Sequence, residues 1–477
     1  MESKLELTLE LELQRIISLQ RTAIKNEDVN SSKIREDRIE RAIQLITSNK
    51  LKIMKALSDD FGSKSKGEVL LTEIFSTVNT LKYSKKNTKK WMRRYPRQSL
   101  NPMNLFGSKT FVICQPLGSI GNIVPWNFPI NLCFGPLGSI FAAGNRVIIK
   151  PSEITPVSGS LVKQLIAEYF DEDEAKVITG DSSVAEIFCR QRFDHLLFTG
   201  SSKNAVKVMK AAADNLVPLT LELGGKSPVI ISKSANLEKT AMRILTGKIL
   251  NAGQVCLSPD YVLIDKSSES EFIAKLISLT SSLIPLAEYP NITAIINKAH
   301  KERLNNILKD AKDKGGKIVE LIETKKQNGE QMAPTLILNA TEDMIALKEE
   351  IFGPILPIVG YHNLEEAIDF VNRRPNPLGL YWFGKDRREE DIIIDSTKSG
   401  GVTVNDVIAH VAQDDAPFGG VGWSGMGAYH GKEGFLNFSH AKTVHRQTNL
   451  EWPLSFIRPP YSRRFFSVLN YLTKSKS

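Results

Sequence analysis

The spacing of apolar residues predicts helices over the first part of the chain, from residue 1 to about residue 94. The opening segment alternates leucine with glutamate, which has the period of a strand, but its leucines at 5, 9 and 13 also repeat every fourth residue. Because leucine and glutamate both favour helix, we predict a helix there. Isoleucines at 39, 43, 46 and 53 predict a second helix that ends at Gly62, and a third is predicted over 68–91.

From Lys109 onward, short apolar runs alternate with helix-like stretches. This order predicts a doubly wound parallel sheet, in which ligands bind at the carboxyl ends of the strands. Strands are predicted at 111–114, 119–124, 147–150, 176–179, 195–199, 219–223 and 229–231, with helices near 131–142, 157–169, 183–190 and 203–214.

A second α/β region is predicted after Cys256, and the chain then becomes glycine-rich from Gly419 and finally basic. Its predicted strands are 261–264, 317–321, 379–383 and 401–404, and its predicted helices are 269–283, 298–312, 364–372 and 389–397.

The composition is that of a globular protein with a sizeable core. The chain has 477 residues, of which 42% are hydrophobic and 24% charged, enough for two or three domains. It lacks an apolar run of the roughly 18 to 20 residues that a membrane span needs, and its acidic N-terminus is unlike a secretory signal, so we expect a cytoplasmic location. Its four cysteines form no Cys-x-x-Cys pair and no cluster with metal-ligand spacing, so we expect no metal site.

The net charge of +9 comes in part from residues 82–97, which carry eight basic residues, and from the C-terminal tail. An excess of positive charge is typical of proteins that bind nucleic acid or an anionic membrane. We favour the simpler interpretation that these basic residues form a solvated helix face. No nucleic-acid-binding motif is present in the sequence, and we expect no nucleic-acid partner.

An acid and a cysteine, Glu222 and Cys256, lie 34 positions apart (256 − 222) in glycine-rich surroundings. Most free cysteines are small buried hydrophobic residues. A cysteine near a base is also the pairing that nucleophilic catalysis requires.

Three weaker motifs lie at predicted strand ends. Phe198-Thr-Gly-Ser-Ser202 suits a phosphate at a helix N-terminus, although the usual G-x-G-x-x-G pattern is absent. Lys150 and Glu153 either hold ribose hydroxyls or are a surface lysine and the first acid of a helix. Asn127, between two aromatic residues and two prolines, is either an oxyanion donor or part of a structural turn.

Taken together, the motifs resemble the aldehyde dehydrogenase superfamily in order and spacing over nearly the whole chain. They are Pro125-Trp-Asn-Phe-Pro129, Lys150-Pro-Ser-Glu153, Phe198-Thr-Gly-Ser201, Leu221-Glu-Leu-Gly-Gly-Lys-Ser-Pro228, Gly253-Gln-Val-Cys256, Glu350-Ile-Phe-Gly-Pro354 and Pro417-Phe-Gly-Gly420. Finer features resemble the class 3 branch and, within it, the coniferyl aldehyde dehydrogenases. These are Phe170-Asp-Glu-Asp-Glu174, Pro259-Asp-Tyr-Val-Leu263 and Ser424-Gly-Met-Gly-Ala-Tyr-His-Gly431.

The resemblance implies an α/β fold with a Rossmann-like cofactor domain, an α/β catalytic domain and a small oligomerisation arm. The implied divisions are residues 1–96 with 113–222 for the N-terminal helices and cofactor domain, 223–424 for the catalytic domain, 97–112 with 425–450 for the arm, and 451–477 for the tail. It also implies a homodimer. The aromatic and basic tail could lie on a membrane surface, but we favour packing on a partner subunit.

The resemblance further implies that Cys256 attacks the aldehyde, that Asn127 stabilises the oxyanion and that Glu222 activates water. NAD is the expected cofactor, with NADP possible, because Glu153 repels a 2′-phosphate while Lys150 tolerates one. The residues implied to bind the cofactor are Pro125, Trp126, Lys150, Glu153, Gly200, Ser201, Glu350 and Phe352.

Two positions depart from the family pattern. Ala205 stands where a second glycine is usual and puts tight pyrophosphate binding in question, and Val255 stands where threonine is common. Two rival interpretations remain open: an acylating enzyme that passes the thioester to coenzyme A, and a non-enzymatic protein that keeps the fold. Acylating enzymes commonly lack an acid at the position of Glu222, which argues against the first rival. The intact Cys256 and Asn127 argue against a non-enzymatic protein.

Overall fold

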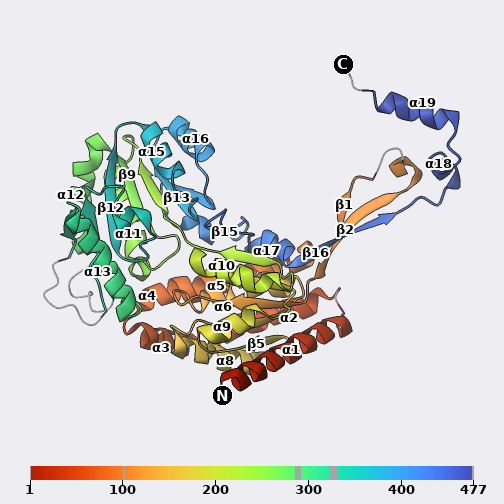
Figure 1. The fold of residues 1–477 in the computed structure, drawn as a ribbon, viewed down its shortest axis with the longest axis horizontal. Helices are drawn as coiled ribbons and strands as arrows, with labels where there is room; N and C mark the ends of the chain where they lie inside the picture. The colour runs from red at the N-terminus through yellow and green to blue at the C-terminus, as the bar shows by residue number, and fades with distance from the viewer. Residues whose placement is uncertain (1, 29, 100–102, 285–291, 323–329, 475–477) are drawn as a thin grey trace.

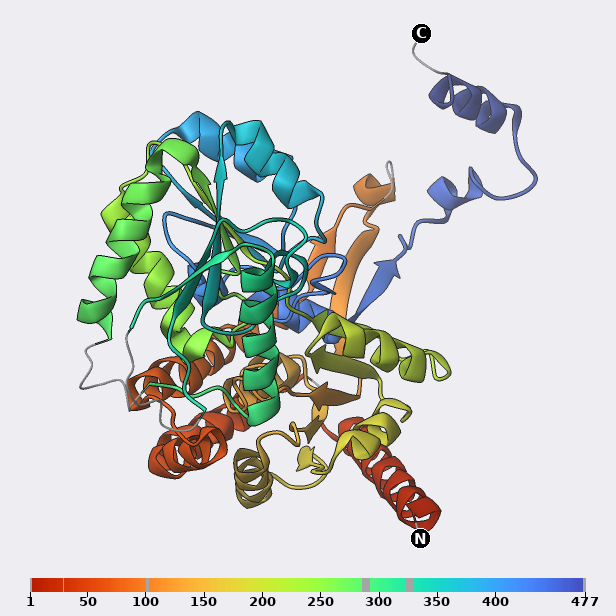
Figure 2. The same ribbon diagram turned by 60° about the vertical axis from the view of Figure 1, so that its left-hand side comes forward.

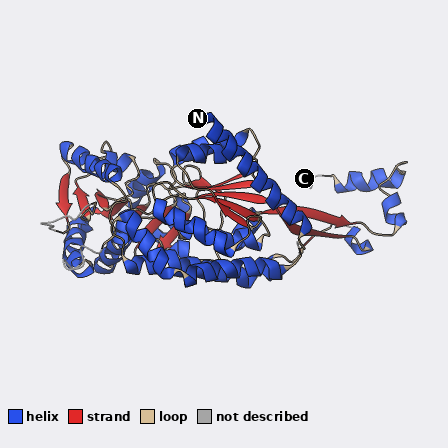
Figure 3. Ribbon diagram, turned by 90° about the horizontal axis from the view of Figure 1, so that it is seen from below, coloured by secondary structure: helices blue, strands red, loops and turns tan. Residues whose placement is uncertain are grey.

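Three sheets organise the chain in the computed structural model, which describes residues 2–28, 30–99, 103–284, 292–322 and 330–474 (Figure 1). A six-stranded and a seven-stranded sheet each lie between layers of helices, and a three-stranded sheet projects from the six-stranded one (Figures 1 and 3).

The N-terminal helices cover the six-stranded sheet (Figure 2). They are α1 Glu2–Asn26, α2 Ser32–Ser48, α3 Lys50–Phe61, α4 Lys66–Glu68, the π-helical turn η1 Val69–Phe75, and α5 Ser76–Trp91. The helix predicted for the leucine and glutamate alternation is confirmed, and so is the stop at Gly62, which is left-handed with φ +71°. The prediction that the isoleucines from 39 to 53 lie on one helix ending at Gly62 was wrong, because two helices, α2 and α3, share this stretch. The helix breaks at Asn49, whose Nδ2 donates to Leu45 O at 2.9 Å and competes with the regular backbone pattern.

The six-stranded sheet has the order β15-β7-β6-β3-β4-β5, parallel except at β15. Successive side chains of a strand point to opposite faces of the sheet. Ile148 accordingly packs with α1, α9 and α10 on one face, and Val147 and Ile149 pack with α2, α5 and α8 on the other. Its elements are β3 Ser119–Ile123, β4 Arg146–Lys150, β5 Ala175–Val177, β6 His195–Thr199, β7 Leu219–Glu222, β15 Gly425–Met426, α6 Asn131–Phe134, α7 Leu137–Ala142, α8 Pro156–Tyr169, α9 Ser182–Cys189 and α10 Ser202–Ala213.

The seven-stranded sheet has the order β10-β11-β12-β9-β8-β13-β14 and is parallel except at β10. Its strands are β8 Pro228–Ile231, β9 Tyr261–Asp265, β10 Lys317–Glu320, β11 Thr335–Leu338, β12 Ile355–Tyr361, β13 Gly379–Phe383 and β14 Gly401–Val404. Its helices are α11 Leu237–Ile249, α12 Glu269–Leu283, α13 Lys298–Asp313, α14 Ile345–Lys348, α15 Leu364–Asn372 and α16 Arg387–Ser396. The sequence did not predict α11, β11 or β12.

The three-stranded antiparallel sheet contains β1 Tyr95–Arg97, β2 Lys109–Pro116 and β16 Ser439–Arg446. The strand predicted at 111–114 lies here and not in the parallel sheet, and the one at 229–231 lies in the seven-stranded sheet. An apolar run marks a strand but does not say which strand it joins. The boundaries of the predicted domains stay predictions.

The chain continues beyond this sheet into two short helices that stand away from the other two sheets (Figures 1 and 3). Before them, α17 Gly431–Asn437 packs on the body, and α18 Glu451–Ser455 and α19 Arg463–Leu472 follow β16. The apolar residues Phe465, Phe466, Leu469 and Leu472 all lie on α19. The rings of Phe106 and Trp452 meet edge to face at 4.9 Å and hold α18 against the three-stranded sheet.

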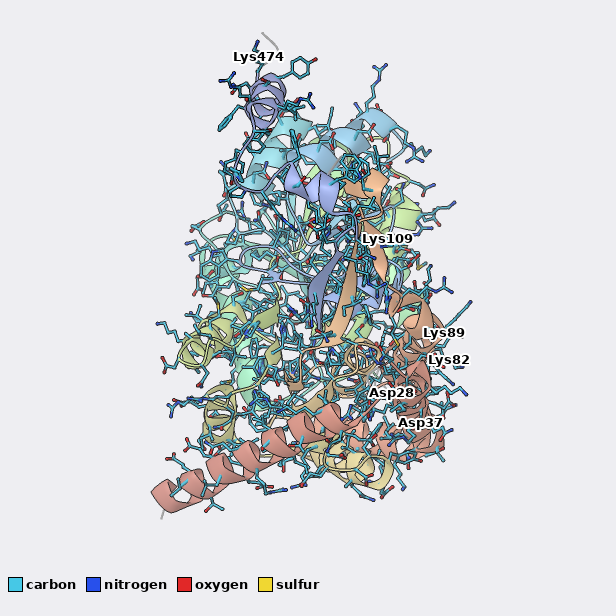
Figure 4. The ribbon with its side chains drawn as sticks, turned by 90° about the vertical axis from the view of Figure 1, so that its right-hand side faces the viewer. Asp28, Asp37, Lys82, Lys89, Lys109 and Lys474 are labelled. Carbon is cyan, nitrogen blue, oxygen red and sulfur yellow. The ribbon has the colours of Figure 1, made fainter. Side chains whose placement is uncertain are left out.

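The basic run follows the outer face of α5. Lys82 and Lys89 point away from the body (Figure 4), while Leu81, Thr88 and Trp91 are buried. Among the described residues, no helix combines the length and the apolar character that crossing a bilayer requires.

A partly buried network of ion pairs ties α2 to the six-stranded sheet. Arg38 donates to Glu174 at 2.8 Å and also to Glu27, and Arg41 donates to Glu174 at 2.7 Å. Burial opposes ionisation of Glu174, but the hydrogen bonds and charges of Arg41 and Arg38 outweigh it and lower the pKa of this carboxyl to about 2.

Glu174→Gln should lower the free energy of unfolding at pH 7 by roughly 1–3 kcal/mol, because the three charged hydrogen bonds from Arg38 and Arg41 weaken or are lost. Since the folded pKa lies below the unfolded one, this contribution is present above about pH 4.5 and is lost as the pH falls toward 2. Urea unfolding from pH 7 to pH 3 measures it. Asp37→Asn is the matched control, since Asp37 bonds the same Arg41 at 2.8 Å on the exposed side. Equal effects of the two changes would contradict the account.

Candidate active site

Cys256 follows a left-handed turn that few residue types adopt. After α11, Asn251 (φ 49°) and Ala252 (φ 53°) lead to Gly253 (φ 71°). A methyl group on Gly253 would lie 2.3 Å from Gly353 O, so both conformation and space require glycine. Strained positions of this kind persist only where the surroundings hold them.

Side-chain amides hold the turn in place. Asn251 Nδ2 donates to Gln254 O at 3.1 Å, and Gln254 Nε2 donates to Asn251 O and to Ala294 O, each at 3.0 Å. Glu68 Oε1 accepts from the Asn251 N–H at 3.2 Å. The backbone that presents Cys256 is therefore fixed from several parts of the chain.

Asn127 reaches the same turn from the loop after β3. Its Nδ2 donates to Gln254 O at 3.2 Å, and its own carbonyl accepts from Asn251 Nδ2 at 3.2 Å. The side chain is buried. The structure thus places this amide against the backbone two residues before Cys256.

Glu222 lies at the carboxyl end of β7, next to the chain that returns as β15. Its carbonyl accepts from the Gly200 N–H at 3.0 Å, and a methyl group on Gly419 would lie 3.1 Å from its Oε1. Neither carboxyl oxygen has a hydrogen-bond partner within the part of the chain that the structure describes. Burial raises the pKa of Glu222 well above its usual range.

The thiol of Cys256 lies within the influence of two carboxyl groups. Burial, and then the charges of Glu350 and Glu222, raise the pKa of this thiol to about 12. Burial and the charge of Asp260 likewise raise the pKa of Glu350 to about 8. A positively charged group that enters this site lowers all three pKa values.

The segment that carries Glu350 is anchored by buried charges. Lys226 bonds Asp260 and donates to Glu349 O at 2.8 Å, and Asp260 Oδ2 accepts from the Ile351 N–H at 2.9 Å. A methyl group on Gly224 would lie 2.2 Å from Glu350 Oε1, so this glycine gives the carboxyl its space. The motif around Glu222 therefore also positions Glu350.

Two predicted cofactor residues meet through their rings. Trp126 and Phe352 lie edge to face at 5.4 Å, and the ring of His300 lies 5.0 Å from that of Trp126. Phe352 has a left-handed backbone, with φ 48°. Its ring direction is thus set by a strained turn next to Glu350.

The other predicted cofactor residues lie at the carboxyl ends of β3, β4 and β6. Pro125 comes after Val124, whose N–H donates to Lys150 O at 3.0 Å. Lys150 is buried and its Nζ donates to Glu153 Oε2 at 3.2 Å, which leaves the carboxylate of Glu153 partly exposed at the sheet edge. A carboxylate at such a sheet edge is able to accept hydrogen bonds from the hydroxyl groups of a ligand.

Gly200 and Ser201 form the turn from β6 into α10. Ser201 caps this helix, since its Oγ accepts from the Asn204 N–H at 3.3 Å. Ala205 is buried in the apolar cluster beneath the turn together with Phe198. The extra methyl group is therefore accommodated in the core, and the helix N-terminus suits an anion.

An aromatic cluster that the sequence did not assign lies beside Cys256. Tyr381 Oη donates to Leu257 O at 2.5 Å, and the ring of His410 lies 6.3 Å from that of Tyr381. Phe418 stacks on His430 at 4.9 Å. The ring of His410 also lies 6.2 Å from that of Phe418 and so links the two pairs. Sequence motifs contain Phe418 and His430, but no spacing in the sequence shows that β13 brings Tyr381 to His410.

The loop of residues 410–416 contacts α5. Asp414 accepts from Asn79 Nδ2 at 3.0 Å and from Thr80 Oγ1 at 2.8 Å, and Tyr83 bonds Asp415. Within the described residues, no group of three His, Cys, Asp or Glu side chains is arranged to hold a metal ion.

Comparison of the sequence with known proteins places the chain in one family. The sequence profile of the aldehyde dehydrogenase family matches residues 12–444. The chain is 46% identical over 448 residues to coniferyl aldehyde dehydrogenase of Pseudomonas sp. (strain HR199), with 93% of this chain and 92% of that protein covered. It is 44% identical over 453 residues to a probable coniferyl aldehyde dehydrogenase of Caulobacter vibrioides, with 94% and 93% covered.

Solved structures agree with the sequence comparison. The substrate-bound state of AldH from Staphylococcus aureus has a TM-score of 0.90 at 36% identity and covers 97% of this chain and 99% of that one. Betaine aldehyde dehydrogenase from the same species, in complex with NAD+, has a TM-score of 0.81 at 26% identity, with 91% and 87% covered. The predicted α/β fold is confirmed. The chain belongs to the aldehyde dehydrogenase family and is an oxidoreductase that acts on aldehydes.

Proposed function

We propose that this enzyme oxidises an aromatic aldehyde, with coniferyl aldehyde as the first choice, to its carboxylic acid with NAD and water. The observation that carries the proposal is the hydrogen bond from Asn127 Nδ2 to Gln254 O, 3.2 Å long and two residues before Cys256. The carboxyl of Glu222 has no hydrogen-bond partner among the described residues, and it is close enough to Cys256 for its charge to raise the pKa of the thiol. The coniferyl aldehyde dehydrogenases at 46% and 44% identity support the choice of substrate.

The chemistry begins at Cys256. Its thiolate adds to the carbonyl carbon, and the Asn127 amide donates to the oxyanion that forms. One such donor stabilises the transition state by about 2.7–4 kcal/mol. Loss of a hydride from the adduct leaves a thioester on Cys256, and Glu222 then takes a proton from the water that hydrolyses it.

A nicotinamide cofactor fits the residues at the sheet edge. When bound, oxidised NAD supplies a hydride acceptor and a positive ring charge, which suits a site where the pKa of Cys256 is raised by two carboxyl groups. Lys150 and Glu153 would hold a ribose, and Ser201 would lie by the phosphates. Glu350 and Phe352 would lie by the nicotinamide end. The carboxylate of Glu153 favours NAD over NADP by repelling a 2′-phosphate.

The three-stranded sheet supports the proposal of a homodimer. It extends from the body and leaves β1 and β16 as its two outer strands. An outer strand or face of such a sheet is a natural surface for a second copy. The apolar residues of α19 are mostly exposed, which agrees with packing on a partner subunit.

To test the proposed reaction and substrate directly, the purified enzyme is incubated with coniferyl aldehyde, benzaldehyde or a series of alkanals, each with NAD or NADP. Chromatography measures the carboxylic acid. We expect kcat/KM to be highest with coniferyl aldehyde and NAD, without coenzyme A. A product that requires coenzyme A, or higher kcat/KM for every alkanal, would contradict the proposed reaction or substrate.

Cys256→Ser should lower kcat by about 10³-fold or more, because a hydroxyl is a far weaker nucleophile at this position. Binding of NAD should stay within about 3-fold by isothermal titration, since the cofactor residues lie on other loops. Cys189→Ser, at a buried cysteine on α9, is the control and should keep its activity. Full turnover of Cys256→Ser would disprove the role of this thiol.

Glu222→Gln should lower the steady-state rate by about 10²–10⁴-fold and still release a burst of reduced cofactor, because only hydrolysis needs the base. Stopped-flow absorbance separates the two phases. Since burial raises the pKa of Glu222, ionising it destabilises the fold as the pH rises above 4.5. The variant should therefore unfold at the same or a higher temperature at pH 8. A steady-state rate equal to that of the wild type would show that another group is the base.

A further inference from the structure

A lysine and a glutamate are buried together behind the loop that carries Asn127, and neither takes part in the proposed chemistry. Lys64 follows α3, and Glu73 lies in the π-helical turn η1. Their side chains are 1% and 0% exposed, and Lys64 Nζ lies 3.4 Å from Glu73 Oε1. Burying two charged side chains costs hydration free energy, which their hydrogen bonds and mutual attraction must offset.

The pair bonds both ends of the segment that begins at Asn127. Lys64 Nζ donates to Asn127 O at 3.2 Å. Glu73 Oε2 accepts from the Ile130 N–H at 3.1 Å and from the Asn131 N–H at 2.9 Å. Three backbone groups of one short loop are thus fixed by two side chains from the N-terminal helices.

Aromatic rings close the remaining space around the ammonium group. Lys64 Nζ lies 4.0 Å from the ring centre of Phe61 and 5.4 Å from that of Phe128. Burial lowers the pKa of Lys64 and raises the pKa of Glu73, while the opposite charge of each partner acts against the shift. The ion pair is therefore enclosed by protein.

Such a pair contributes more to geometry than to stability. A buried ion pair adds little stability beyond what apolar side chains of the same volume provide, because both charges lose their hydration. Its hydrogen bonds, however, are directional, and one of them ends on the residue whose side-chain amide meets the Cys256 turn. A displacement of about 1 Å in a catalytic group costs up to about 10²-fold in rate.

We propose that Lys64 and Glu73 are positioning residues that hold the Asn127 amide where the oxyanion forms. The inference rests on the proposed function, since it assigns the pair to the oxyanion step of that reaction. The residues act through Asn127 and do not contact the aldehyde.

The first experiment compares Lys64→Met with wild type. Methionine keeps the length of the side chain and removes the ammonium donor. We expect kcat to fall about 10-fold to 100-fold, while KM for the aldehyde and Kd for NAD change less than about 3-fold. Lys55→Met is the matched control, because Lys55 on α3 pairs with Asp59 at 2.7 Å on the exposed surface, and its kcat should match wild type.

A double-mutant cycle with Asn127→Ala separates positioning from general damage. Once the oxyanion donor is gone, Lys64→Met should change kcat by less than about 2-fold. The same 10-fold to 100-fold loss in both backgrounds would overturn the inference, since Lys64 would then act by another route.

The variant Lys64→Met/Glu73→Gln controls for folding. It removes both charges, so no unpaired charge stays buried, and the glutamine oxygen can still accept from the Ile130 and Asn131 N–H groups. We expect its melting temperature to recover relative to Lys64→Met while kcat stays low. Recovery of kcat together with stability would overturn the inference. Wild-type enzyme without any aldehyde oxidation would instead overturn the proposed function itself.

Discussion

The left-handed turn at Asn251, Ala252 and Gly253 is the constraint on which the rest of the site depends. Asn251 and Ala252, two successive non-glycine residues with positive φ, cost free energy that the local sequence does not recover, so partners elsewhere must hold them. Those partners come from the loop after β3, from the N-terminal helices and from Ala294, whose carbonyl accepts from Gln254 Nε2. The turn that carries Cys256 thus exists only where these parts of the chain meet.

The same junction sets the electrostatics of the site. Glu222, Glu350 and Cys256 share a poorly hydrated space, and burial raises the pKa of each. The two nearby lysines described above donate their hydrogen bonds elsewhere. Lys226 bonds Asp260 and Glu349 O, and Lys64 bonds Asn127 O. The resting site therefore favours the uncharged thiol, and a cationic ring at the carboxyl edge of the sheet would favour the thiolate.

The sequence predicted those parts of the fold that are local. Runs such as 147–150 and 195–199 combine apolar residues with flanking helix signals, and both are strands of the parallel sheet. It failed where partners are distant in the chain. Nothing in residues 111–114 shows that they pair with β16, and the break at Asn49 depends on one side-chain bond to Leu45.

The candidate site divides in the same way. The motifs predicted Cys256, Glu222 and Asn127 as site residues, because each stands among glycines or prolines with a restricted backbone. Lys64, Glu73 and Tyr381 carry no such mark, since their importance comes only from the residues that the fold brings to them. The only hint in the sequence is that Glu73 is a charged residue inside the helix predicted over 68–91, and its burial becomes visible only in the structure.

The covalent intermediate tests the central claim most directly. Wild-type enzyme is mixed with coniferyl aldehyde and NAD, quenched in acid within milliseconds, digested and analysed by mass spectrometry. The account predicts that the peptide containing Cys256 gains the mass of the acyl group and that peptides with Cys114, Cys133 and Cys189 do not. Formation of the acid with no acyl group on Cys256 at any quench time would contradict it.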